Sequence, residues 1–268
     1  MKHLSRAYIF LILGILYIPI ITLVFFSFNA ANSTASFTGF SLRWYVELFH
    51  SPDTFIALRN TLILAVSSSL LATLIGTAAA VGIYRMRSKL AKSAIESVTN
   101  IPMMNPDIVT GMSMMLFFVA VAGLLQLEYD NFGFLFMLIA HTTFSLPYVI
   151  LSVLPRVQGL GKSLSEAAMD LGCTPLQSFF KVELPNIMPG VISGMIMAFT
   201  LSLDDFVISY FVGSSSFQTL PLLIYSMTKK KVTPDMYALS TLIIVTVFTL
   251  LLVSNVRAGK QRKKEGHR

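Results

Sequence analysis

The stretch Lys162–Pro185 reads KSLSEAAMDLGCTPLQSFFKVELP, and both of its halves carry signals for the start of a helix. In the first half, Ser163 is followed three residues later by Glu166, the spacing of an N-terminal capping box. The second half repeats this spacing at Thr174–Gln177 and adds a first-turn proline. Gly172, between the halves, suits the left-handed conformation that ends many helices. The stretch therefore predicts two short helices joined by a sharp turn.

Long apolar segments flank this stretch. The chain has 268 residues with a mean hydropathy of +0.72, and 12% of them are charged, about half the share found in soluble domains. Six segments approach the roughly 20 apolar residues needed to cross a hydrocarbon core. They are approximately 7–28, 60–84, 101–125, 132–154, 186–212 and 237–256. The sequence therefore predicts an all-α integral membrane protein with six transmembrane helices, and it excludes a soluble enzyme, a disordered chain and a disulfide-rich domain.

The basic residues lie between and beyond the apolar segments, so they indicate orientation and not nucleic-acid binding. If residue 1 is cytoplasmic, the cytoplasmic segments hold 15 of the 20 Lys and Arg residues. We therefore expect both termini in the cytoplasm, with 156–185 as the longest cytoplasmic connection. The run Lys229–Lys231 on the outside opposes this bias and is interpreted as a solvated patch. The basic tail 257–268 is expected to bind anionic membrane lipid.

The residue order within the central stretch matches a family pattern. Glu166-Ala167-Ala168, three residues, Gly172, nine residues and Val182-Glu183-Leu184-Pro185 resemble the cytoplasmic EAA loop of ABC importer permeases, E-A-A-x3-G-x9-I-x-L-P. Val182 in place of Ile is the one departure. Capping and amphipathicity alone would also fit a connector that lies on the membrane surface. The resemblance implies that the loop couples this chain to a separate ATPase through Glu166, Ala167, Ala168, Gly172, Leu184 and Pro185.

Three acidic residues fall inside the expected spans. Asp107 lies in NPDIVTG, where Pro102 and Pro106 interrupt the start of the helix, and Asp204 and Asp205 lie in FTLSLDDFV. A charge at the membrane centre costs roughly 2.5–3.5 kcal/mol on insertion scales, so it normally faces a bundle interior or a water-filled path. No span contains Lys or Arg to pair with them, which favours a path for a cationic solute. The alternative is that polar neighbours neutralise them and they hold helices together.

A second resemblance extends from the first span to about Val256. The segments Asn105–Gly111 and Phe199–Phe211, with Trp44-Tyr45 and the loop, resemble the second permease subunit of spermidine/putrescine ABC importers. This resemblance implies a type I ABC importer permease fold in the bacterial inner membrane and ATP-driven import of a polyamine. The implied partners are a homologous permease, two ATPase subunits and an external solute-binding protein. The implied substrate path contains Asp107, Asp204, Asp205, Trp44 and Tyr45.

The same resemblance divides the chain into a first helix with its external loop (1–59), a permease core (60–256) and a basic cytoplasmic tail (257–268). The permease is expected to have no catalytic residue and no cofactor, because ATP and Mg would be held by the partner ATPase. Gly161-Lys162-Ser163 mimics the end of a phosphate-binding loop, but Arg156 stands where that pattern needs Gly. No metal site is expected, because the four His are scattered and Cys173 is the only cysteine.

Several interpretations remain open at this point. Trp44 and Tyr45 fit either an interfacial aromatic anchor or a gate that offers a cation-π face. His141 is expected to hydrogen-bond to Thr142 or Thr143 between helices in preference to relaying protons. One rival function is an ABC permease for another solute, such as ferric iron, thiamine or an amino-acid derivative. Another is a proton-coupled secondary transporter that uses the three Asp residues as a relay, whereas an intramembrane enzyme lacks a nucleophile-base pair.

Overall fold

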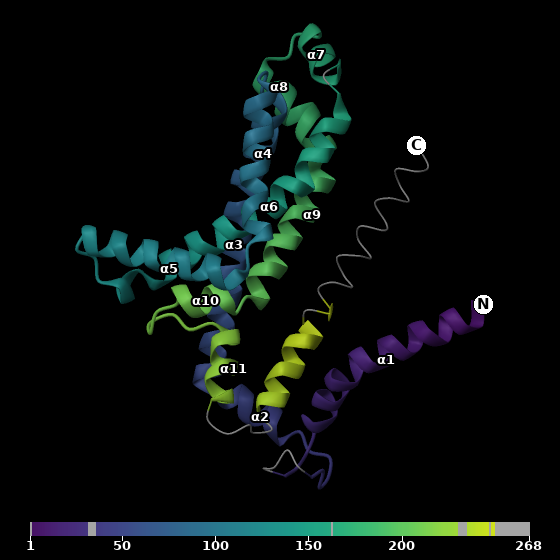
Figure 1. Cartoon of the computed structure of the whole chain (residues 1–268), viewed down its shortest axis with the longest axis vertical. Coiled ribbons are helices and arrows are strands. Elements are labelled where there is room, and N and C mark those ends of the chain that lie inside the picture. Colours follow the sequence, from purple (N-terminus) through teal and green to yellow (C-terminus); the bar gives the residue numbers. More distant parts are fainter. Residues whose placement is uncertain (1, 32–35, 162, 230–234, 247, 250–268) are drawn as a thin grey trace. The chain divides into compact units, whose positions relative to one another are not determined.

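The computed structural model describes residues 2–31, 36–161, 163–229, 235–246 and 248–249 (Figure 1). Every regular element in these residues is helical, and their β contacts are two isolated bridges, Asn29–Phe40 and Ser214–Phe217. The chain divides into two compact units. One unit comprises residues 58–221, and the other comprises residues 1–57 together with 222–268.

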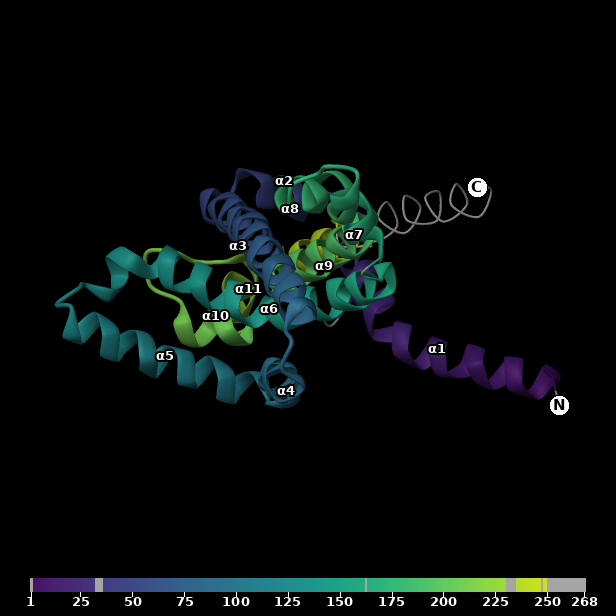
Figure 2. The ribbon, with the colours of Figure 1, turned by 90° about the horizontal axis from the view of Figure 1, so that it is seen from above.

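The unit of residues 58–221 contains most of the helices (Figures 1 and 2). They are α3 (Pro52–Arg85, whose first turns belong to the other unit), α4 (Lys89–Met104), α5 (Asp107–Leu124), η1 (Tyr129–Phe132), α6 (Gly133–Leu160), α7 (Ser163–Asp170), α8 (Pro175–Ser178), η2 (Phe179–Glu183), α9 (Leu184–Asp204) and α10 (Val207–Val212). The other unit contains α1 (Lys2–Phe26), α2 (Arg43–His50), most of α11 (Leu220–Thr228) and the helix Asp235–Thr246.

Five helical segments among the described residues are long and apolar enough to cross a membrane. They are Tyr8–Phe26, Pro52–Arg85, Asp107–Leu124, Tyr129–Leu160 and Pro175–Asp204. These segments confirm the all-α, membrane-type architecture and correspond to the first five predicted spans. The sixth predicted span, 237–256, lies partly outside the described residues, and its described part is a shorter apolar helix that ends at Thr246. The count of six therefore stays a prediction.

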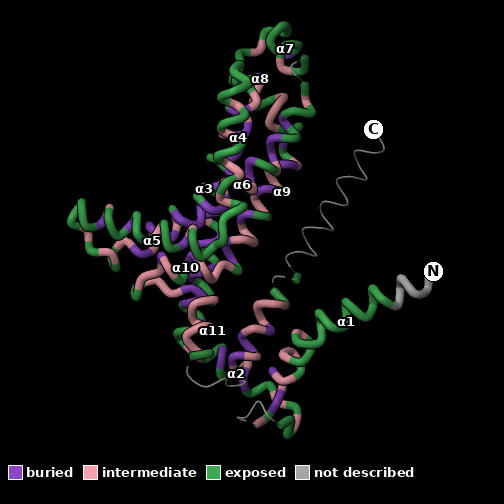
Figure 3. Tube along the Cα trace, in the orientation of Figure 1, coloured by how far each residue is buried: buried purple, intermediate pink, exposed green. Residues whose placement is uncertain are grey.

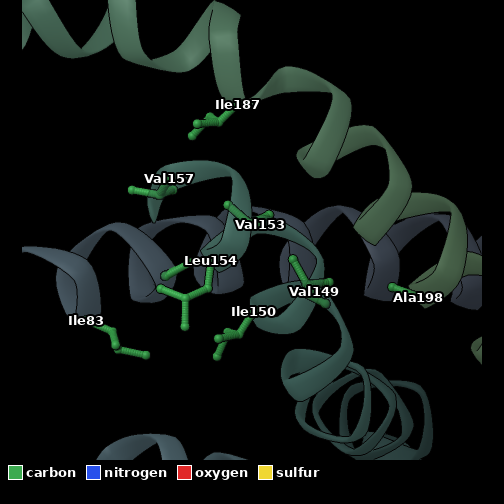
Figure 4. Close-up of a cluster of buried hydrophobic side chains, with 10 residues drawn as sticks. Ile83, Val149, Ile150, Val153, Leu154, Val157, Ile187 and Ala198 are labelled. Atoms are coloured by element: carbon green, nitrogen blue, oxygen red, sulfur yellow. The ribbon is translucent and has the colours of Figure 1, made fainter. Parts of the chain in front are cut away.

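The core of the 58–221 unit lies between α3, α6 and α9 (Figure 4). Val149 and Val153 of α6 are fully buried, and Ile187 and Ala198 of α9 join the same cluster. Small residues let the backbones approach. A Cβ added to Gly190 of α9 would lie 2.8 Å from the Ser152 carbonyl oxygen of α6. Close packing through small residues is a common way for helices to associate in membranes.

The third predicted span, 101–125, is wrong at its start. The chain is helical through Met104, breaks at Asn105-Pro106 and resumes at Asp107 as α5. Asn105 is extended, with φ −79° and ψ 142°, because the ring of Pro106 disfavours a helical conformation in the residue before it. Pro102, which was expected to interrupt the helix, instead lies inside α4. α4 itself was not predicted.

The fifth predicted span, 186–212, is not one continuous helix. α9 ends at Asp204, Asp205 is extended with ψ 123°, and α10 begins at Val207. The Asp205 carboxylate accepts hydrogen bonds from the backbone N–H groups of Ile208 (3.3 Å) and Ser209 (2.8 Å). These N–H groups belong to the first turn of α10, which has no internal acceptors for them. The side chain therefore begins a new helix where the apolar pattern predicts a continuous one.

In the other unit, α1 is followed by a loop that folds back onto α2. The Trp44 indole N–H donates to the carbonyl oxygen of Asn29 at 2.6 Å. The Tyr45 hydroxyl lies 2.7 Å from Ser27 Oγ. None of the apolar stretch of α1 is buried inside the molecule, so its side chains are available to lipid or to another subunit.

Candidate functional site

The EAA loop forms the predicted pair of short helices, α7 and α8, beyond the ends of α6 and α9 (Figure 1). Gly172 has φ +90°, its N–H donates to the Met169 carbonyl at 2.9 Å, and the Cys173 N–H donates to the Ala168 carbonyl at 3.1 Å. These two bonds form a Schellman motif, which places glycine at the left-handed position. The predicted glycine turn is therefore confirmed.

The two predicted capping boxes have different outcomes. Thr174 and Gln177 exchange both hydrogen bonds, at 3.3 Å and 3.1 Å, so the box at the start of α8 is confirmed. The box of Ser163 and Glu166 is wrong. Ser163 is the first residue of α7 and not the residue before it, and among the described residues no hydrogen bond joins its side chain to Glu166.

The loop has an internal core and an exposed apolar surface. Ser165 Oγ lies 3.1 Å from Ser178 Oγ, which joins α7 to α8, and Ala168 and Ser178 are buried. Apolar residues of the turn, α8 and η2 are exposed: 88% of Leu171, 71% of Leu176 and 60% of Phe180 is accessible, and exposed residues predominate in this loop in Figure 3. Contiguous exposed apolar side chains of this kind mark interaction surfaces.

The predicted coupling residues occupy different parts of the loop. Glu166 and Ala167 are exposed on α7, Ala168 is buried beneath them, and Gly172 forms the turn. Leu184 is half-buried against the core of the 58–221 unit. Pro185 is exposed in the first turn of α9, where its missing N–H costs no helical hydrogen bond.

A cleft of about 240 Å³ lies between this loop and the ends of α3 and α6. Glu166, Met169 and Pro175 line it from the loop side. Across it, Arg85 at the end of α3 forms an ion pair with Glu183, with its Nη2 2.9 Å from both carboxylate oxygens. This ion pair connects α3 to the segment that leads directly into α9.

The predicted acidic residues lie at the two helix breaks of the 58–221 unit. Asp107 is exposed at the first position of α5, and Asp204 is exposed at the last position of α9. Helices α5 and α10 pack closely against each other. A Cβ added to Gly111 of α5 would lie only 3.0 Å from Phe211 Cδ2 of α10. The start of α5 and the break before α10 therefore belong to neighbouring segments.

Asp205 differs from these two carboxylates, because it is nearly buried and has several partners. Its side chain is 9% exposed. Besides the two backbone N–H groups, its Oδ2 lies 3.5 Å from His141 Nε2. His141 was not among the expected partners of the carboxylates, because only Lys and Arg were expected to pair with them. Including the histidine at the middle of the fourth span would have supplied the candidate.

His141 has other partners than those predicted. Its Nδ1 lies 2.7 Å from Ser202 Oγ and its Nε2 lies 3.1 Å from Ser209 Oγ. Thr143 instead bonds to the Ile139 carbonyl of its own helix, and the Thr142 hydroxyl has no hydrogen-bond partner among the described residues. The prediction that His141 bonds between helices is correct, but its partners are serines of α9 and α10.

Trp44 and Tyr45 lie in the other unit, where both side chains hold the loop after α1. The Arg43 guanidinium carbon is 5.2 Å from the centre of the Trp44 ring, and Trp44 is buried. Their role in solute passage stays a prediction. Among the residues that the structure describes, no group of three or more His, Cys, Asp or Glu could hold a metal ion.

Known proteins resemble this chain in sequence over nearly its whole length. A family model described as a binding-protein-dependent transport system inner membrane component matches residues 72–264. The spermidine/putrescine transport system permease protein PotC of Haemophilus influenzae is 39% identical over 257 residues, which cover 96% of this chain and 97% of that protein. The putrescine transport system permease protein PotI of Escherichia coli K12 is 38% identical over 262 residues, which cover 96% and 93%.

Solved structures of ABC transporters share the fold. A chain of a bacterial ABC transporter involved in alginate import has a TM-score of 0.79 at 17% identity, over 97% of this chain and 94% of that chain. The methionine ABC transporter MetNI, solved in inward-facing conformations, has a chain with a TM-score of 0.61 at 18% identity, over 78% and 98%. The family model and the two permeases above each match well over half of the chain. The chain therefore belongs to the family of binding-protein-dependent transport system inner membrane components.

Proposed function

We propose that this chain is the non-catalytic permease subunit of an ATP-driven importer of polyamines, spermidine or putrescine. The observation that carries this proposal is the 38–39% identity, over more than nine tenths of the chain, to permeases named for these solutes. The exposed carboxylates at the two helix breaks support it, because polyamines are cations that need separated negative charges along a path.

The EAA loop is the proposed docking element for a separate ATPase, which would hold ATP and Mg. Leu171, Leu176 and Phe180 provide its apolar contacts. The chain runs without interruption from α8 through the π-helical turn Phe179–Glu183 into α9. Displacement of the loop would therefore move α9, and the Arg85–Glu183 ion pair would move the end of α3 with it.

Asp107 and Asp204 are the proposed carboxylates of the solute path, because both are exposed and neither has an ion-pair partner in the described residues. Asp205 contributes differently. Its carboxylate already holds the start of α10, and it would fix the break that leaves Asp204 exposed. Trp44 and Tyr45 are retained as aromatic residues of the outer loop, either as an interfacial anchor or as a gate.

The proposed assembly follows from the family. It comprises a homologous permease, two ATPase subunits and an external solute-binding protein, in the bacterial inner membrane. This chain would have six transmembrane helices of the type I arrangement, with both termini in the cytoplasm. The apolar surface of α1, of which no residue is buried, fits contact with lipid or with the homologous permease.

The test is reconstitution of the complex in vesicles with ATP inside the compartment that holds the ATPase. Labelled spermidine and putrescine are expected to accumulate and to stimulate ATP hydrolysis in the presence of the external binding protein. Stimulation by ferric iron, thiamine or an amino-acid derivative, and not by polyamines, would replace the proposed solute. Uptake by this chain alone, driven by a proton gradient without ATP, would instead identify a secondary transporter.

A further inference from the structure

A chain of hydrogen bonds crosses the buried centre of the 58–221 unit and ends at Ser209, beside Asp205. The Ser68 hydroxyl of α3 donates to Ser202 Oγ of α9 at 3.0 Å. Ser202 Oγ in turn lies 2.7 Å from Nδ1 of His141, on α6. On the other side of the ring, Nε2 faces Ser209 Oγ at 3.1 Å and Asp205 Oδ2 at 3.5 Å. Four helices, α3, α6, α9 and α10, therefore meet at this imidazole.

The direction of the Ser68 bond favours one tautomer of the ring. Ser202 Oγ already accepts from Ser68, so its own proton is available to donate to His141 Nδ1. An imidazole nitrogen that accepts carries no proton, so the ring proton lies on Nε2. The Nε2–H group points at Ser209 and Asp205. The Nε2–H group thereby bonds to Ser209 Oγ and lies within 3.5 Å of the Asp205 carboxylate.

The contact between His141 and Asp205 is important because both groups are buried. His141 is 2% exposed and the Asp205 side chain 9%, so water has little access to either group. A buried carboxylate is stable only where hydrogen-bond donors replace its water shell. The hydrogen-bond donors are two backbone N–H groups of α10, and His141 Nε2 lies beside them, 3.5 Å from Asp205 Oδ2.

We propose that His141 is a positioning residue for Asp205: its Nε2–H holds the carboxylate on the start of α10 and so fixes the break that presents Asp204 to the cationic solute. This role rests on the proposed function, in which Asp204 lies on the polyamine path. The competing explanation is a purely structural tie, in which His141 matters only because Nδ1 joins α6 to Ser202 of α9.

Two amide substitutions separate these explanations. In His141→Gln the side-chain amide extends to the position of Nε2 and keeps a donor toward Asp205. In His141→Asn the shorter amide occupies the position of Nδ1, keeps a partner for Ser202 and removes the donor. If His141 positions Asp205, His141→Gln should retain more transport than His141→Asn. If His141 is only a structural tie, His141→Asn should retain more transport than His141→Gln.

The transport measurement uses the full complex in vesicles. We expect His141→Gln to keep a KM for spermidine near that of the wild type and His141→Asn to raise it about tenfold, a difference of about 1.4 kcal/mol. The matched control is Thr143→Val, two residues along α6, whose hydroxyl bonds only to its own helix. Equal KM values for Asn and Gln, or a higher KM for Gln, would overturn the proposal.

A double-mutant cycle tests whether the effect passes through Asp205. His141→Asn and Asp205→Asn should be strongly non-additive, because each removes one side of the same contact. His141→Asn and Asp107→Asn should combine additively, because Asp107 is on α5 and has no bond to the chain of hydroxyls. Additivity of the His141 and Asp205 pair would contradict the positioning role.

A spectroscopic measurement on the wild-type complex does not depend on the solute and needs variants only to assign the resonances. The ¹⁵N resonances of His141 in the labelled complex, identified by their loss in His141→Asn or by elimination of the other histidines, should show a proton on Nε2 alone. A proton on Nδ1 would overturn the assignment of the donor. A wild-type complex that imports no polyamine would contradict the proposed function. The tautomer would still show whether the ring proton of His141 lies on Nε2 or on Nδ1.

Discussion

Gly172 shows how one residue determines the form of the EAA loop. Its φ of +90° lies in the region that side chains with a Cβ adopt at a cost of roughly 1–2 kcal/mol. The space around it is open, because an added Cβ would meet no atom within 4 Å. A substitution there therefore acts through the backbone conformation and not through a clash.

Gly172→Val is expected to leave the subunit inserted but to weaken coupling between ATP hydrolysis and uptake, because the turn that orients Leu171 and Leu176 would be strained. Gly172→Asn should be milder, since Asn tolerates the left-handed region. Gly159→Ala is a matched control in α6, with equally open surroundings and no positive φ. The measurement is the ratio of solute transported to ATP hydrolysed, and a wild-type ratio in Gly172→Val would exclude the turn as a coupling element.

The neighbouring residues Asp204 and Asp205 are expected to fail in different ways when truncated. Asp205→Ala removes the acceptor for two N–H groups of α10, and loss of such a cap costs about 0.5–2 kcal/mol. Asp204→Ala removes an exposed carboxylate and should leave the thermal unfolding temperature of the complex nearly unchanged. An equal loss of stability in both variants would contradict the assignment of Asp205 as the cap.

Removal of the charge at Asp204, which should leave stability nearly unchanged, is expected to reduce transport. Asp204→Asn keeps the shape of the side chain and removes a charge from the proposed path, so uptake of spermidine should fall by about tenfold or more, since 1.4 kcal/mol corresponds to a factor of ten. Binding of spermidine to the external protein should not change, because that site lies on another chain. Asp107→Asn is assayed in the same way. Wild-type uptake by these variants would contradict a role in the solute path and would indicate a structural role for the carboxylates.

Among the elements, the features predicted best from the sequence are a cap and a turn that depend on residues close together in the chain. The cap of Thr174 and Gln177 and the turn at Gly172 depend on residues within a few positions, and both were predicted. The break at Asp205 was missed because apolar residues predominate on both sides of Asp204-Asp205, so 186–212 was predicted as one span. Nothing in that span indicates that the carboxylate will bond to the next turn.

The contact between His141 and the two serines could not be predicted for another reason. It depends on which faces of α6, α9 and α10 meet, and hydrophobic periodicity does not determine facing partners when all the helices are apolar. The same limit applies to Arg85 and Glu183, which are far apart in sequence and were assigned only to cytoplasmic segments. Part of the local chemistry, at Gly172 and at Thr174 with Gln177, was therefore predictable, and tertiary pairing was not.

The Arg85–Glu183 pair leads to a prediction about the link between α3 and η2. Arg85 is half-exposed, so the pair should add little to stability, within the range of about 0–1 kcal/mol for exposed pairs. Its expected contribution is to make α3 and α9 move together. Glu183→Gln should reduce the ratio of transport to ATP hydrolysis more than it reduces the unfolding temperature.

The exchanged variant Arg85→Glu with Glu183→Arg provides the control for that prediction. It restores the attraction with the charges reversed, so its coupling ratio should recover relative to either single reversal. Arg43 and Glu47 of α2 form a comparable exposed pair with a distance of 3.8 Å, and its removal should not affect coupling. Equal coupling in the single and exchanged variants would show that the ion pair does not connect the two helices.

For the molecule as a whole, the orientation in the membrane decides whether the loop can meet an ATPase at all. The positive-inside bias predicts that the loop is in the cytoplasm, and the one cysteine of the chain, Cys173, lies in the turn between α7 and α8. Cys173 is free and partly exposed, so its thiol reports the side of the membrane without any engineered residue.

A membrane-impermeant maleimide should therefore leave Cys173 unmodified in intact cells and should label it in inverted vesicles that carry this chain without its ATPase. Cys173→Ser measures background labelling of other proteins. Assembly with the ATPase should lower the labelling rate in inverted vesicles, because the apolar turn beside the thiol would be covered. Labelling of Cys173 in intact cells would place the loop outside, which would overturn both the predicted orientation and the coupling role of the loop, whatever solute the complex carries.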